Sequence, residues 1–280
     1  MHNETMTMEA LETRYAMIEG HRIAYKETGE GQPLLLIHGI PTNKLMWRGV
    51  MPELAKHYRV IAPDMLNYGE SDMPQDADVS INAQTRIFVK LMDALGVSRA
   101  DVVSHDIGGG IGQLMAVNHP ERIRRQVLID SVCFDSWPIP EFKQLLEPGV
   151  EEATSVEEFT TIMRDFMPSG VHDPAVATEE MTERYVAPWN SAEGKTAFLR
   201  NMRRLNKEYT QAIAGDLKNI EIQTLVLWGD KDSFQKPDYA PMLADAIPGA
   251  ELIWVKDAGH WVTDEKPEET ARYILEFLTR

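Results

Sequence analysis

The stretch Asp101-Val-Val-Ser-His-Asp-Ile-Gly-Gly-Gly110 carries the strongest local signal in the chain. A short apolar run that ends at Ser104 is typical of a buried strand, and the glycines at 108–110 open a segment with helical spacing. A sharp strand-turn-helix needs small residues on both sides of its apex, because strand and helix come close together there. Ser104 and Gly108 occupy those positions, so the sequence predicts that Asp106 stands at the apex of a nucleophile elbow.

This stretch allows two other interpretations. If Ser104 were the nucleophile, Val102 and Asp106 would occupy the positions that require small side chains, which disfavours that register. Asp106 could instead be the N-cap of the helix that follows, a role that Asp serves well. Taken alone, the N-cap role and catalysis have similar weight, and the rest of the chain favours catalysis.

Short apolar runs like the one before Asp106 recur along the chain and alternate with helical segments. After a pair of strands at Ala16–Ile18 and Arg22–Thr28, buried strands are predicted at Pro33–Ile37, Arg59–Ala62, Asp101–Ser104, Gln126–Ile129, Thr224–Trp228 and Glu251–Val255. Helices are predicted between and after them at Trp47–His57, Ile81–Leu95, Gly109–His119, Asp238–Ile247 and Pro267–Leu278. This alternation indicates an α/β fold with a mostly parallel sheet flanked by helices.

The alternation is interrupted after the sixth strand. Between Asp135 and Gly215 there is no buried-strand run, and helices are predicted at Val156–Phe166, Thr178–Val186 and Ala192–Ala214. A simple crossover needs only about a dozen residues. We therefore expect a helical cap over 135–215, resting on the carboxyl end of a core domain formed by 1–134 and 216–280. An additional helical layer without a ligand role is the alternative.

A candidate base and acid follow later strands. His260 lies after the last predicted strand and before a helix, where a triad base falls in chain order. Asp232 follows the strand Thr224–Trp228, past its turn, and is our first choice for the acid that orients His260. Asp130, at the end of the preceding strand, is the second choice and Asp230 the third.

The loop after the strand Pro33–Ile37 predicts an oxyanion-type site. Its Gly39 permits a turn that directs main-chain amides into the cleft. The amide of Ile40, together with that of Ile107 just after the elbow residue, would form the two-donor site.

Composition excludes several classes of function. The chain has 280 residues and a formal net charge of −16, which argues against nucleic acid or an anionic membrane as partner. Its single cysteine, Cys133, excludes an internal disulfide framework and a Cys-rich zinc site. Met1–Arg14 has no continuous apolar run and no later stretch could span a bilayer, so we expect neither a signal nor an anchor and a cytoplasmic location.

With these motifs in place, the chain resembles the α/β-hydrolase superfamily, and within it the haloalkane dehalogenase and epoxide hydrolase branch that uses an aspartate nucleophile. The resemblance spans nearly the whole chain. It is carried by His38-Gly-Ile-Pro-Thr42 with Met46-Trp-Arg48, Asp64-Met-Leu-Asn-Tyr-Gly-Glu-Ser-Asp72, Ser104-His-Asp-Ile-Gly-Gly109, Gly229-Asp-Lys-Asp232 and Gly259-His-Trp261. It implies a lid at the position of the predicted cap.

The chain also departs from that branch. Its dehalogenases usually hold the halide with a Trp directly after the nucleophile and with a polar residue between the Gly and Pro of the first motif, and here these positions are Ile107 and Ile40. Epoxide hydrolases use lid tyrosines to protonate the opening ring. The aromatic residues that could line a substrate pocket are Trp47, Tyr185, Trp189, Tyr209 and Trp261.

An aspartate nucleophile constrains the reaction. Attack on an ester carbonyl would give an anhydride, whereas attack on a tetrahedral carbon gives a stable alkyl-enzyme ester. His260 would then activate water, with Asp232 holding its tautomer. We expect a small neutral organic substrate, no metal or organic cofactor, and a monomer or small homo-oligomer. A cofactor-free lyase or oxygenase and a ligand receptor on the same fold are the alternatives.

Overall fold

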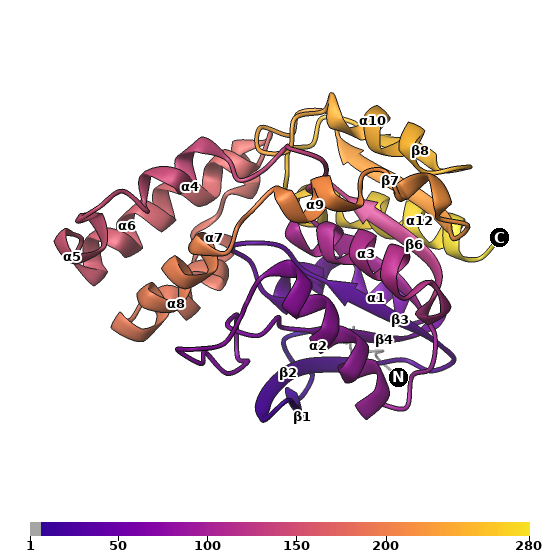
Figure 1. Cartoon of the computed structure of the whole chain (residues 1–280), viewed down its shortest axis with the longest axis horizontal. Helices are drawn as coiled ribbons and strands as arrows, with labels where there is room; N and C mark the ends of the chain where they lie inside the picture. Colours follow the sequence, from indigo (N-terminus) through magenta and orange to yellow (C-terminus); the bar gives the residue numbers. More distant parts are fainter. Residues whose placement is uncertain (1–6) are drawn as a thin grey trace, which may run out of the picture.

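The computed structural model describes residues 7–280, so the expectation for Met1–Arg14 lies partly outside the described residues. Its strands form one eight-stranded sheet in the order β1-β2-β4-β3-β5-β6-β7-β8. They are β1 (Arg14–Ile18), β2 (His21–Thr28), β3 (Gln32–Ile37), β4 (Tyr58–Pro63), β5 (Ala100–His105), β6 (Ile123–Ile129), β7 (Gln223–Gly229) and β8 (Glu251–Val255). β2 runs antiparallel to both of its neighbours and the other neighbouring pairs are parallel, so the predicted α/β class is confirmed (Figure 1).

The central strands form where the sequence has continuous apolar runs, because a parallel sheet is covered on both faces. All six residues of β5 are buried, as are the last four residues of β3 and of β6. The parallel register places Ile37 beside Ser104, and His105 beside Ile129. The loops after these three strands therefore all leave the sheet at the carboxyl end of the strands, where they can build a common site.

Helices cover both faces of the sheet. In the core they are α1 (Met51–Leu54), α2 (Ile81–Ala94), α3 (Ile107–Asn118), α10 (Tyr239–Ala246), α11 (Val262–Glu265) and α12 (Pro267–Leu278). α2 and α3 pack together on one face, and α1 and α12 lie on the other (Figure 1). The predicted helix Trp47–His57 is instead a 3₁₀ helix, Lys44–Gly49, followed by the short α1, because Pro52 fits only in the first turn of an α-helix.

The chain between β6 and β7 is helical. It contains α4 (Pro140–Gln144), α5 (Val150–Ala153), α6 (Val156–Phe166), α7 (Glu179–Val186), α8 (Ala192–Arg203) and α9 (Glu208–Ile213). Figure 1 shows α4 to α8 gathered to one side of the sheet, whereas α9 lies against α3. We call residues 135–215 the inserted helical segment.

The predicted helix Ala192–Ala214 is wrong as a single element. It is divided into α8 and α9 by a break at 204–207. Asn206 explains part of the break, because its side-chain oxygen accepts a hydrogen bond from the Glu208 amide at 2.9 Å and so competes with continued helix.

Polar contacts attach the inserted helical segment to the core. The side-chain amide of Asn67, in the loop after β4, donates to the carbonyl of Ala197 at 2.8 Å and to Asn201 Oδ1 at 2.6 Å. Arg200 donates to Asn67 Oδ1 at 2.5 Å. Since Asn67 and Asn201 are buried, these hydrogen bonds fix α8 on the core.

Within residues 7–280, no helix combines the length and apolarity that crossing a membrane requires.

The close approach of α3 to β3 gives a first prediction. A Cβ atom on Gly108 would lie 2.4 Å from the carbonyl oxygen of His38 and 2.6 Å from that of Ile37. Gly108→Ala should therefore lower the free energy of unfolding by about 1–3 kcal/mol, measured by denaturant unfolding. The control is Gly215→Ala, since a Cβ there meets nothing within 4 Å. Equal stability of the two variants would contradict the packing argument.

Candidate active site

Asp106 lies in a strained turn between β5 and α3. Its backbone has φ 53° and ψ −121°, a conformation that costs a non-glycine residue about 1–3 kcal/mol. Main-chain hydrogen bonds hold it there, from the Asp106 amide to the Ile129 carbonyl at 3.1 Å and from the Val132 amide to the Asp106 carbonyl at 3.1 Å. The side chain is thereby held in a fixed direction at the carboxyl end of β5.

The carboxyl group of Asp106 faces main-chain amides. Ile40 N–H donates to Asp106 Oδ2 at 3.0 Å, and the amide of Ile107 also hydrogen-bonds to this carboxyl group. Asp106 occupies the N-cap position of α3, as the alternative expected, but its side chain makes no capping hydrogen bond. The structure thus brings Ile40, Ile107 and Asp106 together.

Burial changes the acidity of Asp106. The residue is only 4% exposed, and burial raises the pKa of its carboxyl group to about 6, although the charge of His260 and the two amides act in the opposite direction. Near neutral pH the carboxylate is therefore mostly ionised, yet it is poorly solvated. A carboxylate in this state is available as a nucleophile or as a base.

His260 is paired with Asp232. Its Nδ1 donates to Asp232 Oδ2 at 2.8 Å, and because a carboxylate only accepts, Nε2 is left as the nitrogen that can act on a ligand. Burial alone would lower the pKa of His260, but the carboxylates of Asp232 and Asp106 outweigh burial and raise it. The other oxygen of Asp232 accepts from the amides of Phe234 and Gln235 at 2.7 and 2.9 Å, which fixes its orientation.

The two other acids considered for this role have different contacts. Asp130 is fully buried, and its Oδ1 accepts from the Gly229 amide at 2.8 Å. Burial, and then the neighbouring carboxylate of Asp232, raise the pKa of Asp130 well above its usual range. Asp230 accepts from the amide of Asp257 at 2.8 Å, outside the pocket.

The loop that carries His260 is held by the inserted helical segment. The amides of His260 and Trp261 both donate to the carbonyl of Gly170, at 2.7 and 3.1 Å. The carboxylate of Glu265 accepts from Gly259 at 2.6 Å and from His172 at 2.8 Å, so it joins the loop to the same segment. From within the core, His105 Nε2 bonds to the His260 carbonyl at 2.9 Å. The imidazole is therefore fixed from two sides.

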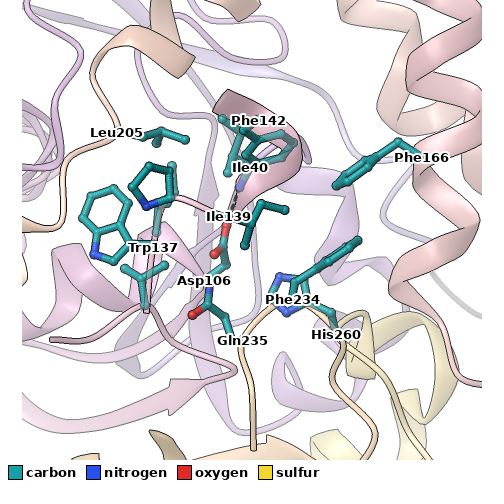
Figure 2. Close-up of a pocket in the computed structure, with 13 residues that line it drawn as sticks. Ile40, Asp106, Trp137, Ile139, Phe142, Phe166, Leu205, Phe234, Gln235 and His260 are labelled. Carbon is teal, nitrogen blue, oxygen red and sulfur yellow. Dashed lines mark hydrogen bonds between the residues drawn. The ribbon is translucent and has the colours of Figure 1, made fainter. Parts of the chain in front are cut away.

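Asp106 and His260 open onto one small pocket (Figure 2). Its other walls are mostly apolar and come from the core and from the inserted helical segment. They consist of Ile40, Ile107, Val132, Trp137, Pro138, Ile139, Phe142, Phe166, Leu205, Phe234 and Gln235. Phe166 stacks on Phe234 at 4.9 Å between ring centroids, and Phe234 meets the His260 ring edge-on at 5.3 Å. The pocket suits a small apolar ligand.

The five aromatic residues proposed from the sequence as pocket candidates do not line this pocket. Trp47, Tyr185, Trp189 and Trp261 are buried elsewhere in the core, and Tyr209 is half-buried against it. The Tyr185 hydroxyl donates to Asp264 at 2.7 Å, Trp189 Nε1 to Pro41 at 3.0 Å and Trp261 Nε1 to Met167 at 3.1 Å. Only Trp261 touches the site, where its ring packs on His260 at 4.6 Å.

The sequence reasoning missed the residues that do form the walls. Phe234 and Gln235 follow Asp232 directly, and Trp137 and Ile139 follow the carboxyl end of β6, so their closeness to strand ends was a usable signal. Phe166 and Leu205 carried no such signal, because their position depends on how the inserted helices pack. Among residues 7–280, no group of three or more His, Cys, Asp or Glu side chains is placed to hold a metal ion.

Comparison with known proteins agrees with the fold. A model of the alpha/beta hydrolase fold matches residues 32–153. A 2-hydroxymuconate semialdehyde hydrolase of Pseudomonas sp. (strain CF600) is 32% identical over 271 residues, which cover 95% of this chain and 93% of that protein. The chain belongs to the α/β-hydrolase superfamily.

Two further proteins are similar to this chain over nearly its whole length. A solved structure of an alpha/beta hydrolase fold protein from Burkholderia ambifaria has a TM-score of 0.87 and 28% sequence identity, covering 98% of this chain and 100% of that one. The bifunctional epoxide hydrolase 2 of Sus scrofa is 28% identical over 312 residues, covering 96% of this chain and 55% of that protein. The chain is thus similar to hydrolases with different activities.

The buried carboxylate gives a second prediction. Because folding raises the pKa of Asp106 from 3.8 to about 6, the unfolded chain releases this proton first, and stability falls as pH rises through that interval. Above pH 6 the penalty reaches about 3 kcal/mol. Asp106→Asn should therefore raise the free energy of unfolding by about that amount at pH 7, with little gain at pH 4. The control is Asp245→Asn at the surface; a gain for Asp106→Asn that is equal at both pH values would contradict the argument.

Proposed function

We propose that this hydrolase attacks a tetrahedral carbon of a small neutral organic substrate with Asp106, forming a covalent alkyl-enzyme ester, as haloalkane dehalogenases do. The single observation that carries the proposal is the hydrogen bond from Ile40 N–H to Asp106 Oδ2 at 3.0 Å. In an enzyme with a serine nucleophile, such amides bind an oxygen of the substrate. Here they bind an oxygen of Asp106 itself.

The position of these amides matches the second step of the proposed reaction. When water attacks the ester, negative charge develops on the carbonyl oxygen of the former Asp106 carboxyl group. The amides of Ile40 and Ile107 already contact that group in the resting structure, so they need not reorganise as the charge appears. His260 takes the proton from water through Nε2, and Asp232 stabilises the resulting imidazolium from Nδ1.

The surroundings of the site favour a neutral substrate. The pocket is small and its walls are mostly apolar. We propose that residues 135–215 act as its cap, over a catalytic core formed by 1–134 and 216–280. The cap stretch Glu147–Glu158 contains five Glu and no Lys or Arg, which disfavours the approach of anions.

Epoxide hydrolysis is the second candidate. It is supported by the similarity to the Sus scrofa bifunctional epoxide hydrolase 2 and uses the same attack by Asp106. The opening ring oxygen would require a proton donor, and among the described residues no tyrosine lines the pocket. The Tyr185 hydroxyl is occupied by Asp264.

Replacement of His260 tests the covalent mechanism. His260→Gln removes the base of the second step but leaves Asp106, so with 1-bromobutane the alkyl-enzyme should accumulate as a mass increase of one butyl group on the intact protein. Asp106→Ala in the same background should show no such increase. Haloalkanes and epoxides would both alkylate Asp106. A parallel incubation with an epoxide therefore shows which of the two substrates gives an adduct, and this distinguishes the two candidates. Absence of any adduct with either substrate would remove the proposal.

Oxygen-18 distinguishes this route from a reaction in which Asp106 acts as an acid or base. In labelled water, with enzyme in excess over substrate, the covalent route gives a first product whose oxygen comes unlabelled from Asp106, while the label enters that carboxyl group. Direct attack by water labels the first product instead. A ligand receptor would bind without releasing product. Mass spectrometry of the product and of the peptide with Asp106 separates these outcomes.

A further inference from the structure

Gln235 places a polar side chain in the wall of the pocket. It lies three residues after Asp232, and its main chain is fixed on both sides. Its amide donates to Asp232 Oδ1 at 2.9 Å, and its carbonyl accepts from Trp228 Nε1 at 3.0 Å. These bonds do not involve the side chain, so the carboxamide is positioned by the same loop that orients the triad acid.

The carboxamide of Gln235 lacks a protein partner. The residue is only 3% exposed, and no described residue hydrogen-bonds to its buried Oε1. An unpaired buried amide costs about 1–3 kcal/mol, so an unsatisfied one in a pocket points to a ligand. Gln235 and Asp106 both line the pocket, and Figure 2 labels both. Oε1 is fully enclosed, whereas Nε2 is not and also lacks a hydrogen-bond partner among the described residues, so the NH₂ end is the one that faces the pocket.

The other polar groups of the lining are already engaged. Trp137 Nε1 donates to Thr210 Oγ1 at 2.7 Å. Asp106 accepts from main-chain amides, and His260 Nδ1 donates to Asp232. Apart from His260 Nε2, which the proposed second step needs as a base, Gln235 is therefore the side chain among the described lining residues that can supply an N–H donor to a leaving group. This matters because Ile107 and Ile40 occupy the positions where related dehalogenases carry their halide donors.

We infer that the Gln235 carboxamide binds the departing halide, an inference that rests on the proposed function. In the first step an Asp106 oxygen forms a bond to the substrate carbon, and the carbon–halogen bond breaks with its electron pair going to the halide. Negative charge thus moves from Asp106 to the halide, where the Gln235 N–H bond strengthens. Water then cleaves the ester, so that alcohol, halide and one proton leave.

The type of donor also defines the substrate class. A carboxamide stabilises an anion through its N–H groups but has no proton to transfer at ordinary pH. Chloride, bromide and iodide leave as stable anions and need no proton, whereas an epoxide oxygen must be protonated. Gln235 therefore specifies small haloalkanes over epoxides.

The test measures the rate of ester formation in the His260→Gln protein, in which the adduct is trapped, by intact mass at successive times with 1-chloro-, 1-bromo- and 1-iodobutane. Adding Gln235→Met keeps the side-chain length and removes the donor. The rate should fall about 10- to 100-fold, and most for chloride, whose charge is the most concentrated. Gln235→Glu is the second variant, since it keeps the shape and carries no N–H when ionised.

Each outcome separates the inference from the proposed function. Adduct formation in His260→Gln at a rate that Gln235→Met leaves unchanged for all three halides would overturn the role of Gln235 and leave the mechanism standing. No adduct in His260→Gln alone would remove the mechanism and the halide role with it. An equal slowing for all three halides would also contradict halide binding, because a disturbed fold does not depend on the leaving group.

Stability gives an independent readout. Gln235→Met removes an unpaired buried amide, so the free energy of unfolding should stay the same or rise while ester formation slows. The matched control is Gln126→Met. Gln126 is also buried with an unpaired Oε1, but it lies away from the pocket and donates to Thr224 at 2.9 Å. This variant should lose stability and keep the rate of ester formation.

Discussion

The structure depends on one constraint, a carboxylate kept ionised in a place that water barely reaches. Asp106 stands at the end of β5 in a backbone conformation that only a well-packed surrounding maintains. The absence of a side chain on Gly108 lets α3 approach β3, so that the Ile107 amide reaches the carboxyl group. The loop after β3 then brings the Ile40 amide to the same group. Fold and site are thus parts of one arrangement.

Electrostatic balance explains why a buried group of acids is tolerated here. The carboxylates of Asp232 and Asp106 act on the imidazole of His260, and Asp130 is a neighbour of Asp232. Burial and the adjacent Asp232 oppose the ionisation of Asp130 and raise its pKa. The raised pKa of His260 reflects the charge of the other two acids.

The sequence was sufficient to predict those parts of the molecule that local chemistry determines. All eight strands were predicted at nearly their observed positions, because buried parallel strands are short continuous apolar runs. Asp106, His260 and Asp232 could be selected because each follows such a run. The walls from the inserted helical segment could not be predicted, since Phe166 and Leu205 reach the pocket only through the packing of the inserted helices. The break at 204–207 was missed because apolar spacing continues across it, while Asn206 acts through a local side-chain bond.

Gly170 limits which residues of the inserted helical segment can be replaced. Its carbonyl holds the main chain at both His260 and Trp261, and a Cβ on Gly170 would lie 2.1 Å from Trp261 Nε1. The attachment is therefore made by main-chain atoms and does not depend on the side chains of the surrounding helices. Gly170 itself is the exception, because a side chain there would collide with Trp261. The helices around it can exchange residues to admit a different molecule while the base stays aligned. A chimera that replaces the whole insert must keep the main chain at Gly170 in place, because otherwise both the position of His260 and part of the pocket wall would be lost.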